Sequence, residues 1–108
     1  MAYSVSWLAE TEQELRRFSR RFQSTIINKV TNIADNVPTS LRLRSVQIIR
    51  GQETLRLNGV LYELDVGSGP RVAFLLDVER ERLIVYLVGT HDYCKENYLA
   101  AAADRLEG

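Results

Sequence analysis

Two side chains that can perform phosphate chemistry stand at the ends of predicted strands. Arg71 follows the turn Gly67–Pro70, and His91, the only histidine in the chain, follows an apolar run that ends at Val88. A guanidinium fixed on a strand can form two hydrogen bonds to a phosphate and stabilise the charge of a phosphoryl transition state. An imidazole titrates near neutral pH and can serve as a general acid or base.

Each of these side chains also has an ordinary structural interpretation. Arg71 can form an ion pair with Glu63 or Asp65 on the neighbouring strand, and a histidine after a strand-end glycine can be a capping or surface residue. The same choice applies to the carboxylates Glu53, Glu63 and Asp65. One of them can act as the base that removes a proton from a ribose 2′-hydroxyl, or all three can belong to a solvated strand edge.

Basic and aromatic side chains near these residues are of the types that bind RNA. The basic ones can contact a polyanion, or they can protect a sheet edge from aggregation. Tyr93 and Tyr98 can stack on bases, or they can anchor the last helix by packing. The predicted RNA-binding residues are Arg42, Arg44, Arg50, Arg56 and Lys95.

The size and composition are those of one folded domain that spans residues 1–108. The chain is 45% hydrophobic and 26% charged, as is usual for globular proteins. Its 14 basic and 14 acidic side chains cancel, with the basic excess in residues 1–56 and the acidic excess in residues 57–108. This asymmetry indicates either a basic face for a polyanion or two halves that attract each other. Zero net charge argues against strong non-specific binding of nucleic acid.

Several other kinds of site have no signature in the sequence. The single cysteine, Cys94, cannot form an internal disulfide, which favours a reducing compartment. There is no Cys/His cluster with zinc-site spacing, no P-loop and no dinucleotide fingerprint. No apolar run approaches the ~20 residues of a membrane span, and the N-terminus lacks a signal pattern. We therefore expect a cytoplasmic protein that requires no metal, cofactor or membrane.

In the N-terminal half, the hydrophobic pattern predicts a strand and two helices. Tyr3–Leu8 alternates as a strand does. Thr11 and Glu14 have the spacing of a capping box, which predicts a helix from Thr11 to about Arg21. A second helix is predicted over Ser24–Asn36, and the two helices should form an antiparallel hairpin. The apolar stripe of the second helix consists of Ile26, Val30, Ile33 and Val37.

The C-terminal half predicts a sheet and one more helix. Leu41–Leu57 is predicted to be extended chain or a short hairpin, Gly89–Lys95 to leave the sheet, and Asn97–Leu106 to form the final helix. The three predicted strands are Val60–Val66, Val72–Val78 and Leu83–Val88, of which the last two are apolar on both faces and therefore central in the sheet.

The predicted fold class is α+β. It has an N-terminal strand, a two-helix hairpin packed on a three- to four-stranded antiparallel sheet, and a short C-terminal helix. The hairpin must cover one face of the sheet to bury its apolar stripes. The other face should be open or half open, and a ligand or partner would bind there.

The element order and three segments resemble the RelE/ParE superfamily, the toxins of bacterial type II toxin–antitoxin systems, and most closely its HigB-like members. The segments are Tyr3–Trp7, Leu61–Val72 with its glycine turn before Arg71, and Val88–Asp92 with its Thr-His pair. The resemblance covers nearly the whole chain. It implies a RelE-like fold and an mRNA interferase, an endoribonuclease that inhibits translation by cutting ribosome-bound mRNA. It also implies an antitoxin protein as partner, in a hetero-oligomer.

The resemblance further implies roles for individual residues. Arg71 matches the strand arginine that stabilises the scissile phosphate, and His91 matches the general acid that protonates the leaving 5′-oxygen. Tyr98 matches an aromatic residue near the C-terminus, and Glu63 or Glu53 would be the base. No metal is needed because the ribose 2′-hydroxyl is the nucleophile.

Two departures from the RelE branch leave other functions open. Many RelE-branch toxins carry lysines where this chain has Glu63 and Asp65, and most are clearly basic whereas this chain is neutral. A ParE-like gyrase inhibitor, or a non-catalytic binding protein with a RelE fold, is therefore the alternative. The pair of Arg71 and His91 favours the nuclease.

Overall fold

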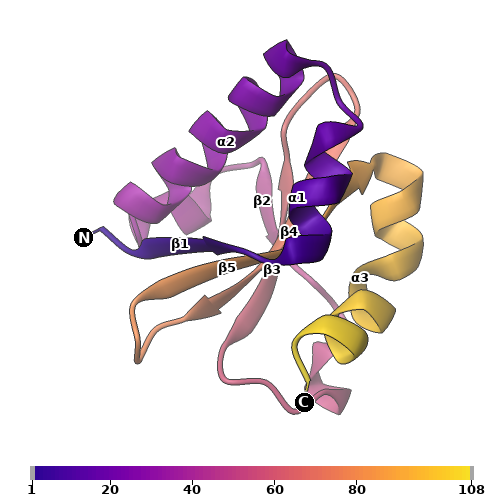
Figure 1. The fold of residues 1–108 in the computed structure, drawn as a ribbon. Helices are drawn as coiled ribbons and strands as arrows, with labels where there is room; N and C mark the ends of the chain where they lie inside the picture. Colours follow the sequence, from indigo (N-terminus) through magenta and orange to yellow (C-terminus); the bar gives the residue numbers. More distant parts are fainter. Residues whose placement is uncertain (1, 108) are drawn as a thin grey trace.

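The computed structural model describes residues 2–107, and its strands form one mixed sheet (Figure 1). The strand order is β1-β5-β4-β3-β2; β1 pairs in parallel with β5, and the other neighbours are antiparallel. The predicted α+β class is confirmed. The strands are β1 (Ser4–Trp7), β2 (Val46–Ile48), β3 (Val60–Asp65), β4 (Pro70–Asp77) and β5 (Arg82–Thr90). The helices are α1 (Ala9–Arg16), α2 (Arg20–Asp35) and α3 (His91–Arg105), with the short 3-10 turns η1 (Thr39–Arg42) and η2 (Gln52–Thr54).

The sheet differs from the prediction in two respects: it has five strands rather than three or four, and it is mixed rather than antiparallel. β1 joins the edge of β5 with Ser4 opposite Arg82 and Trp7 opposite Val85. The direction of a strand that pairs with a partner almost eighty residues away depends on the path of the whole chain. Periodicity within the strand contains no information on that path.

Helix α2 covers one face of the sheet with the apolar stripe that its sequence predicted. Ile26, Val30 and Ile33 are buried there among the side chains of β4 and β5, including Phe74 and Val85. Each large apolar side chain that is fully buried stabilises the fold by about 1.5–3 kcal/mol. The chain reverses direction between α1 and α2, as the predicted hairpin requires (Figure 1).

Helix α3 covers half of the opposite face. Leu61 of β3, Leu75 of β4 and Leu87 of β5 are buried against this helix, which presents the small side chains of Ala101 and Ala102 to the sheet. On the same face, Glu63 and Asp65 follow Leu61 along β3, and Arg71 precedes Leu75 along β4. These charged residues lie beside the first turns of α3 instead of under the helix. The sheet therefore offers a polar surface next to a helix that is firmly packed.

A β-bulge in β5 strengthens the contact with α3. Ala73 pairs with Leu87 and the next residue, Phe74, pairs with Val85, so that Tyr86 has no partner on β4. A bulge places two successive side chains on one face, and both Tyr86 and Leu87 accordingly belong to the core cluster under α3. The buried Tyr86 hydroxyl donates a hydrogen bond to the carbonyl of Tyr98 at 2.9 Å, which satisfies it inside the core.

The predicted capping box is wrong, and so are the predicted ends of the first two helices. α1 begins at Ala9, and Thr11 is buried with its hydroxyl donating to the Leu8 carbonyl at 2.6 Å. α2 begins at Arg20 instead of Ser24, because the Ser19 hydroxyl accepts the Phe22 N–H and caps the helix. Several Ser and Thr residues near the starts of these helices can accept a backbone N–H, so the sequence does not show which of them caps each helix.

Helix α3 also begins earlier than predicted. Its first residue is His91, not Asn97, and its N-cap is Thr90, whose hydroxyl accepts the N–H of Tyr93 at 3.4 Å. Gly89 and Thr90 therefore still belong to β5. The first turns of the helix are polar because they line an accessible part of the sheet, and this polarity hides the helix from a search for apolar periodicity.

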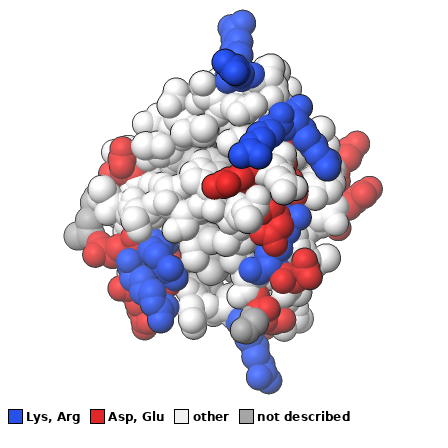
Figure 2. Space-filling view, viewed as in Figure 1, with Lys and Arg blue, Asp and Glu red and all other residues white. Residues whose placement is uncertain are grey.

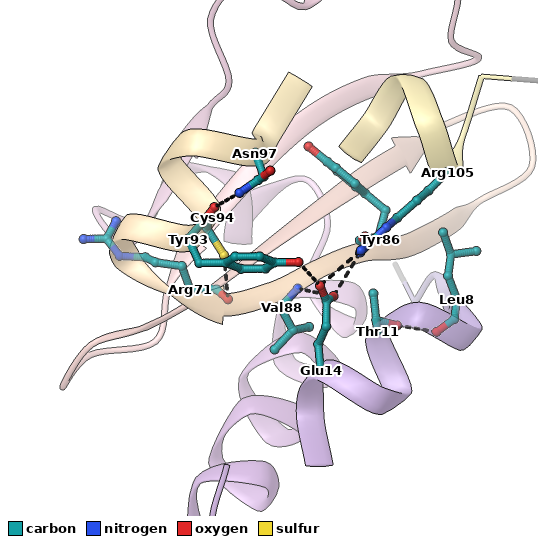
Figure 3. Close-up of polar contacts among 10 residues, drawn as sticks. All are labelled: Leu8, Thr11, Glu14, Arg71, Tyr86, Val88, Tyr93, Cys94, Asn97 and Arg105. Carbon is teal, nitrogen blue, oxygen red and sulfur yellow. Dashed lines mark hydrogen bonds and ion pairs between the residues drawn. The ribbon is translucent and has the colours of Figure 1, made fainter. Parts of the chain in front are cut away.

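A buried carboxylate, Glu14 of α1, connects three elements (Figure 3). Its Oε1 accepts hydrogen bonds from the Val88 N–H at 3.1 Å and from Arg105 Nη1 at 3.0 Å. Its Oε2 accepts from the Tyr93 hydroxyl at 2.6 Å and from Arg105 Nη2 at 3.2 Å. Arg105 also donates to the Tyr86 carbonyl at 2.8 Å. Tyr93 lies near the start of α3 and Arg105 at its end, so this cluster holds the whole helix on the sheet.

The Glu14→Ala substitution should destabilise the fold by about 3 kcal/mol, because it leaves the guanidinium of Arg105 buried without its counter-charge. Urea unfolding followed by circular dichroism measures this loss. The matched control is Glu12→Ala on the exposed side of the same helix, for which we expect a change within about 0.5 kcal/mol. Equal unfolding midpoints for the two variants would contradict the assigned role of Glu14.

Candidate active site

The polar side chains at one end of the sheet line a pocket of about 360 Å³. The pocket is bounded by β2, β3 and β4 on one side and by the first half of α3 on the other. The lining residues are Arg44, Ser45, Gln47, Glu63, Asp65, Arg71, His91, Lys95 and Tyr98. Residues separated by up to 54 positions in the sequence, from Arg44 to Tyr98, thus meet at one place.

Strand register explains why the polar side chains converge. Asp65 of β3 is opposite Arg71 of β4, and Glu63, two residues earlier on the same face, is opposite Gln47 of β2. Because side chains alternate along a strand, all four project toward the α3 side of the sheet. Gly67 and Gly69, both with positive φ, turn the chain tightly between β3 and β4 and so set this register.

Arg71 is the central cation of the pocket and is paired with two carboxylates. Its Nη1 lies 3.7 Å from Glu63 Oε1, and its Nη2 lies 3.4 Å from Asp65 Oδ2. Its Nε is buried and, among residues 2–107, has no hydrogen-bond acceptor. The cross-strand ion pair that the sequence offered as an alternative is thus present. The terminal nitrogens Nη1 and Nη2 carry more N–H donors than these two contacts use, and an anion in the pocket can bind to them.

Tyr98, a largely buried residue that lines the pocket, places its hydroxyl next to Glu63. Burial, followed by the nearby charge of Glu63, raises the pKa of Tyr98 well above its ordinary value. The phenol therefore stays protonated at neutral pH and can act as a hydrogen-bond donor. The prediction that Tyr98 anchors the last helix by packing also holds, because this residue of α3 is buried in the core cluster between the helix and the sheet.

His91 stands at the edge of the pocket as the first residue of α3. Its imidazole is exposed, and Nδ1 lies 3.1 Å from a carboxylate oxygen of Asp92. In the tautomer in which Nδ1–H donates a hydrogen bond to that carboxylate, Nε2 is the nitrogen that can exchange a proton with a ligand. An exposed imidazole with one nitrogen engaged suits the role of a general acid or base.

The remaining predicted residues divide between this pocket and the rest of the surface. Arg44 and Lys95 line the pocket, and Arg50 lines an adjoining groove that also includes Lys95 and Tyr98. Glu53 is exposed on η2 and lies outside the pocket, as do Arg42 and Arg56.

Two lining residues, Ser45 and Gln47, were not anticipated from the sequence. They belong to the short edge strand β2 and the turn before it, in a segment that has little periodicity. Only the pairing of Gln47 with Glu63 brings them to the site.

The charge of the surface is mixed, and basic charge is concentrated only locally. Figure 2 shows basic and acidic side chains interspersed on one face, with a broad uncharged area where α2 lies. The pocket gathers the cations Arg44, Arg71 and Lys95 against the anions Glu63 and Asp65. Anion binding there must rest on specific contacts and not on a large positive field.

Residues 2–107 form no cluster of three or more His, Cys, Asp and Glu side chains that could hold a metal ion. Over the same residues, no helix combines the length and the apolar character needed to cross a membrane.

The fold matches solved RelE structures. A free arginine double mutant of the E. coli toxin RelE has a TM-score of 0.71 and 20% identity, over 98% of this chain and all of that one. A chain of the archaeal RelE–RelB complex from Pyrococcus horikoshii has a TM-score of 0.65 and 12% identity, over 83% and 96% of the two chains. A chain of the RelBE2 toxin–antitoxin complex from Mycobacterium tuberculosis gives 0.64 and 12%, over 84% and 93%.

The protein therefore has the RelE fold, as its sequence predicted. A scan of the sequence against family models gives no match, and neither does a sequence search of curated proteins. The resemblance to HigB-like members stays a prediction, because the matched structures are RelE proteins and RelBE complexes.

The lone cysteine lies beneath the pocket and should be chemically inert. Cys94 is fully buried, and its thiol donates to the carbonyl of Arg71 at 3.6 Å (Figure 3). Burial, followed by the charge of Glu14, raises the pKa of the Cys94 thiol to about 12. The thiolate is the reactive form, so iodoacetamide at pH 8 should leave the native protein unmodified and modify it in denaturant. Rapid modification of native protein, read by mass spectrometry, would show that α3 does not protect this position.

Proposed function

We propose that this protein is the toxin of a type II toxin–antitoxin system and an endoribonuclease that cuts mRNA, with ribosome-bound mRNA as its substrate in the cytoplasm. The observation that carries the proposal is the polar pocket, in which Arg71, His91, Glu63 and Tyr98 converge on one face of a RelE fold. The similar structures support it, since their names describe RelE toxins and their complexes with the antitoxin RelB.

The pocket contains the groups that metal-independent RNA cleavage needs. Glu63 accepts the proton of the ribose 2′-hydroxyl, whose oxygen attacks the adjacent phosphorus. Arg71 stabilises the negative charge that develops on the phosphoryl oxygens. The bond from phosphorus to the 5′-oxygen breaks as His91 donates a proton to that oxygen, and Tyr98 supports the phosphate as a donor. The products are a 2′,3′-cyclic phosphate and a 5′-hydroxyl.

The ion pairs of Arg71 set a condition on this mechanism. A phosphate that binds Arg71 must replace at least one of the two carboxylates. The contact to Asp65 is the easier one to give up, because the Asp65 side chain is 45% exposed and Glu63 is 21% exposed. Exposed ion pairs contribute only about 0–1 kcal/mol. Asp65 can therefore turn into solvent while Glu63 stays next to the substrate.

A non-catalytic role is the second candidate, and the same ion pairs favour it. Two carboxylates beside one guanidinium repel RNA, and the neutral net charge gives no long-range attraction. In that case the fold would serve a binding function, such as inhibition of gyrase. Gyrase supercoiling that is blocked by purified protein, with RNA left intact, would establish this alternative.

We further propose that the partner of this protein is an antitoxin, which neutralises the toxin by forming a hetero-oligomer with it. The similar structures include complexes of RelE with RelB, one of them with a peptide of the antitoxin. A short reading frame next to the gene for this protein is where the antitoxin should be encoded.

The Arg71→Ala and His91→Ala substitutions should abolish growth arrest when the protein is expressed in a bacterial host. In a purified cleavage assay on ribosomes, each should lower the rate by about 10²–10³-fold, since each removes one group that acts in the transition state. Lys29→Ala, an exposed change on α2 at a residue outside the pocket lining, is the control and should behave as wild type. Equal growth arrest by all four proteins would show that the assigned residues do not perform catalysis.

Substitutions of the two carboxylates should have opposite effects. Glu63→Gln removes the proposed base and should lower cleavage by about 10²–10⁴-fold. Asp65→Asn removes only a competitor for Arg71, so cleavage should stay equal to wild type or rise by a few-fold. Glu53→Gln, outside the pocket, should change nothing. If Asp65→Asn were as inactive as Glu63→Gln, the carboxylates would share a structural role and Glu63 would not be the base.

A further inference from the structure

We propose that the apolar pocket beside His91 binds a nucleobase, that of the nucleotide on the 3′ side of the cleaved bond. This inference rests on the proposed ribonuclease function and adds the direction in which RNA lies. The pocket has a volume of about 290 Å³ and is formed by the start of α2, the glycine turn before β4 and the start of α3. Its apolar walls are Phe18, Phe22 and Pro70.

His91 joins this pocket to the polar one. The imidazole belongs to the lining of both pockets, with Arg71 on one side and the two phenylalanines on the other. A nucleotide whose phosphate is bound by Arg71 can therefore extend past His91 without leaving the protein surface. Single-stranded nucleic acids are bound in this way, by a basic groove followed by aromatic side chains on which bases stack.

The positions of the acid and the base assign the direction of the strand. Glu63, the proposed base, lies toward a third groove that also contains Arg50 and Tyr98, so the nucleotide with the reacting 2′-hydroxyl lies on that side. His91, the proposed acid, lies on the opposite side and protonates the 5′-oxygen of the next nucleotide. The base attached to that next nucleotide is then the group that reaches the apolar pocket.

The chemistry of the apolar pocket suits a base and not a phosphate. Phe22 is a large apolar side chain that remains 37% exposed, and its ring packs edge-on against Phe18 with 6.4 Å between centroids. The exposed part of the Phe22 ring is thus available for stacking. The charged side chain at the rim is the carboxylate of Asp92, which repels phosphate. An uncharged aromatic group is the ligand that these walls accept.

The Phe22→Ala substitution tests the inference through binding, without any need for cleavage. The probe is a 2′-deoxy dinucleotide, which cannot be cut because it lacks the nucleophile, compared with an analogue in which the downstream nucleotide has no base. Phe22→Ala should weaken binding of the intact dinucleotide by about five- to tenfold, the lower part of the range for the loss of one stacked base. The abasic analogue should bind wild type and variant equally.

Two variants serve as controls for folding and for ring chemistry. Ile27→Ala removes another apolar side chain of α2 that is 40% exposed and lies outside the pocket, and it should bind as wild type does. Phe22→Tyr keeps the stacking surface and should restore binding. Equal affinities of the wild type, Phe22→Ala and Ile27→Ala, or no binding of the dinucleotide to wild type, would overturn the inference and leave the apolar pocket to a protein partner.

The two proposals fail in different ways. Phe22-dependent binding of the dinucleotide with no cleavage of RNA would support the base pocket and refute catalysis. Arg71-dependent cleavage of RNA by a protein whose binding does not depend on Phe22 would support catalysis and refute the base pocket.

Discussion

The candidate site depends on the position of α3, and that position depends on the buried carboxylate of Glu14. A charge in the core is unfavourable unless it is paired and hydrogen-bonded. Glu14 therefore requires Arg105, the Tyr93 hydroxyl and the Val88 N–H around it at once. This requirement is directional, whereas apolar packing against alanines tolerates sliding. The helix is thereby fixed in the orientation that brings Lys95, His91 and Tyr98 over the polar end of the sheet.

The face of the sheet toward α3 has two parts, an apolar part that packs against the helix and a polar part that lines the pocket. The residues of β3 that face α3 change from apolar to acidic along the strand, from Leu61 to Glu63 and Asp65. α3 covers the first part, because an apolar surface left in water is unfavourable. It does not cover the second, because carboxylates lose favourable hydration when they are buried, even next to a cation such as Arg71. The pocket is a consequence of this change of side-chain type along one strand.

Neutral net charge has a clear consequence for how such a site would bind RNA. Without a strong positive field, affinity must come from close contacts, and Arg71 makes its contacts in competition with Glu63 and Asp65. In such a protein, affinity for RNA would depend more on contacts that position the substrate, for example the stacking of a base on Phe22. A ribosome that holds mRNA in a fixed position would supply the remaining binding energy.

Prediction from sequence succeeded where a local pattern is sufficient and failed where partners are distant. The stripe of Ile26, Val30 and Ile33 predicted the buried face of α2, since only a helix brings these positions to one side. Glu14 was assigned to a capping box from its spacing to Thr11, although its actual partners lie more than seventy residues away. The start of α3 was missed because its first turns are polar.

Local patterns in the sequence were enough to predict the α+β class, the main strands and the apolar stripe of α2, and to identify residue types that suit phosphate chemistry. These follow from periods of two and 3.6 residues and from side-chain chemistry, which are local properties. The parallel pairing of β1 with β5 and the position of Glu53 outside the pocket of Arg71 follow from the path of the whole chain. The fold likewise brings Ser45 and Gln47 to the pocket, which no local pattern predicts. Register and helix docking depend on contacts between distant segments, which the order of neighbouring residues does not specify.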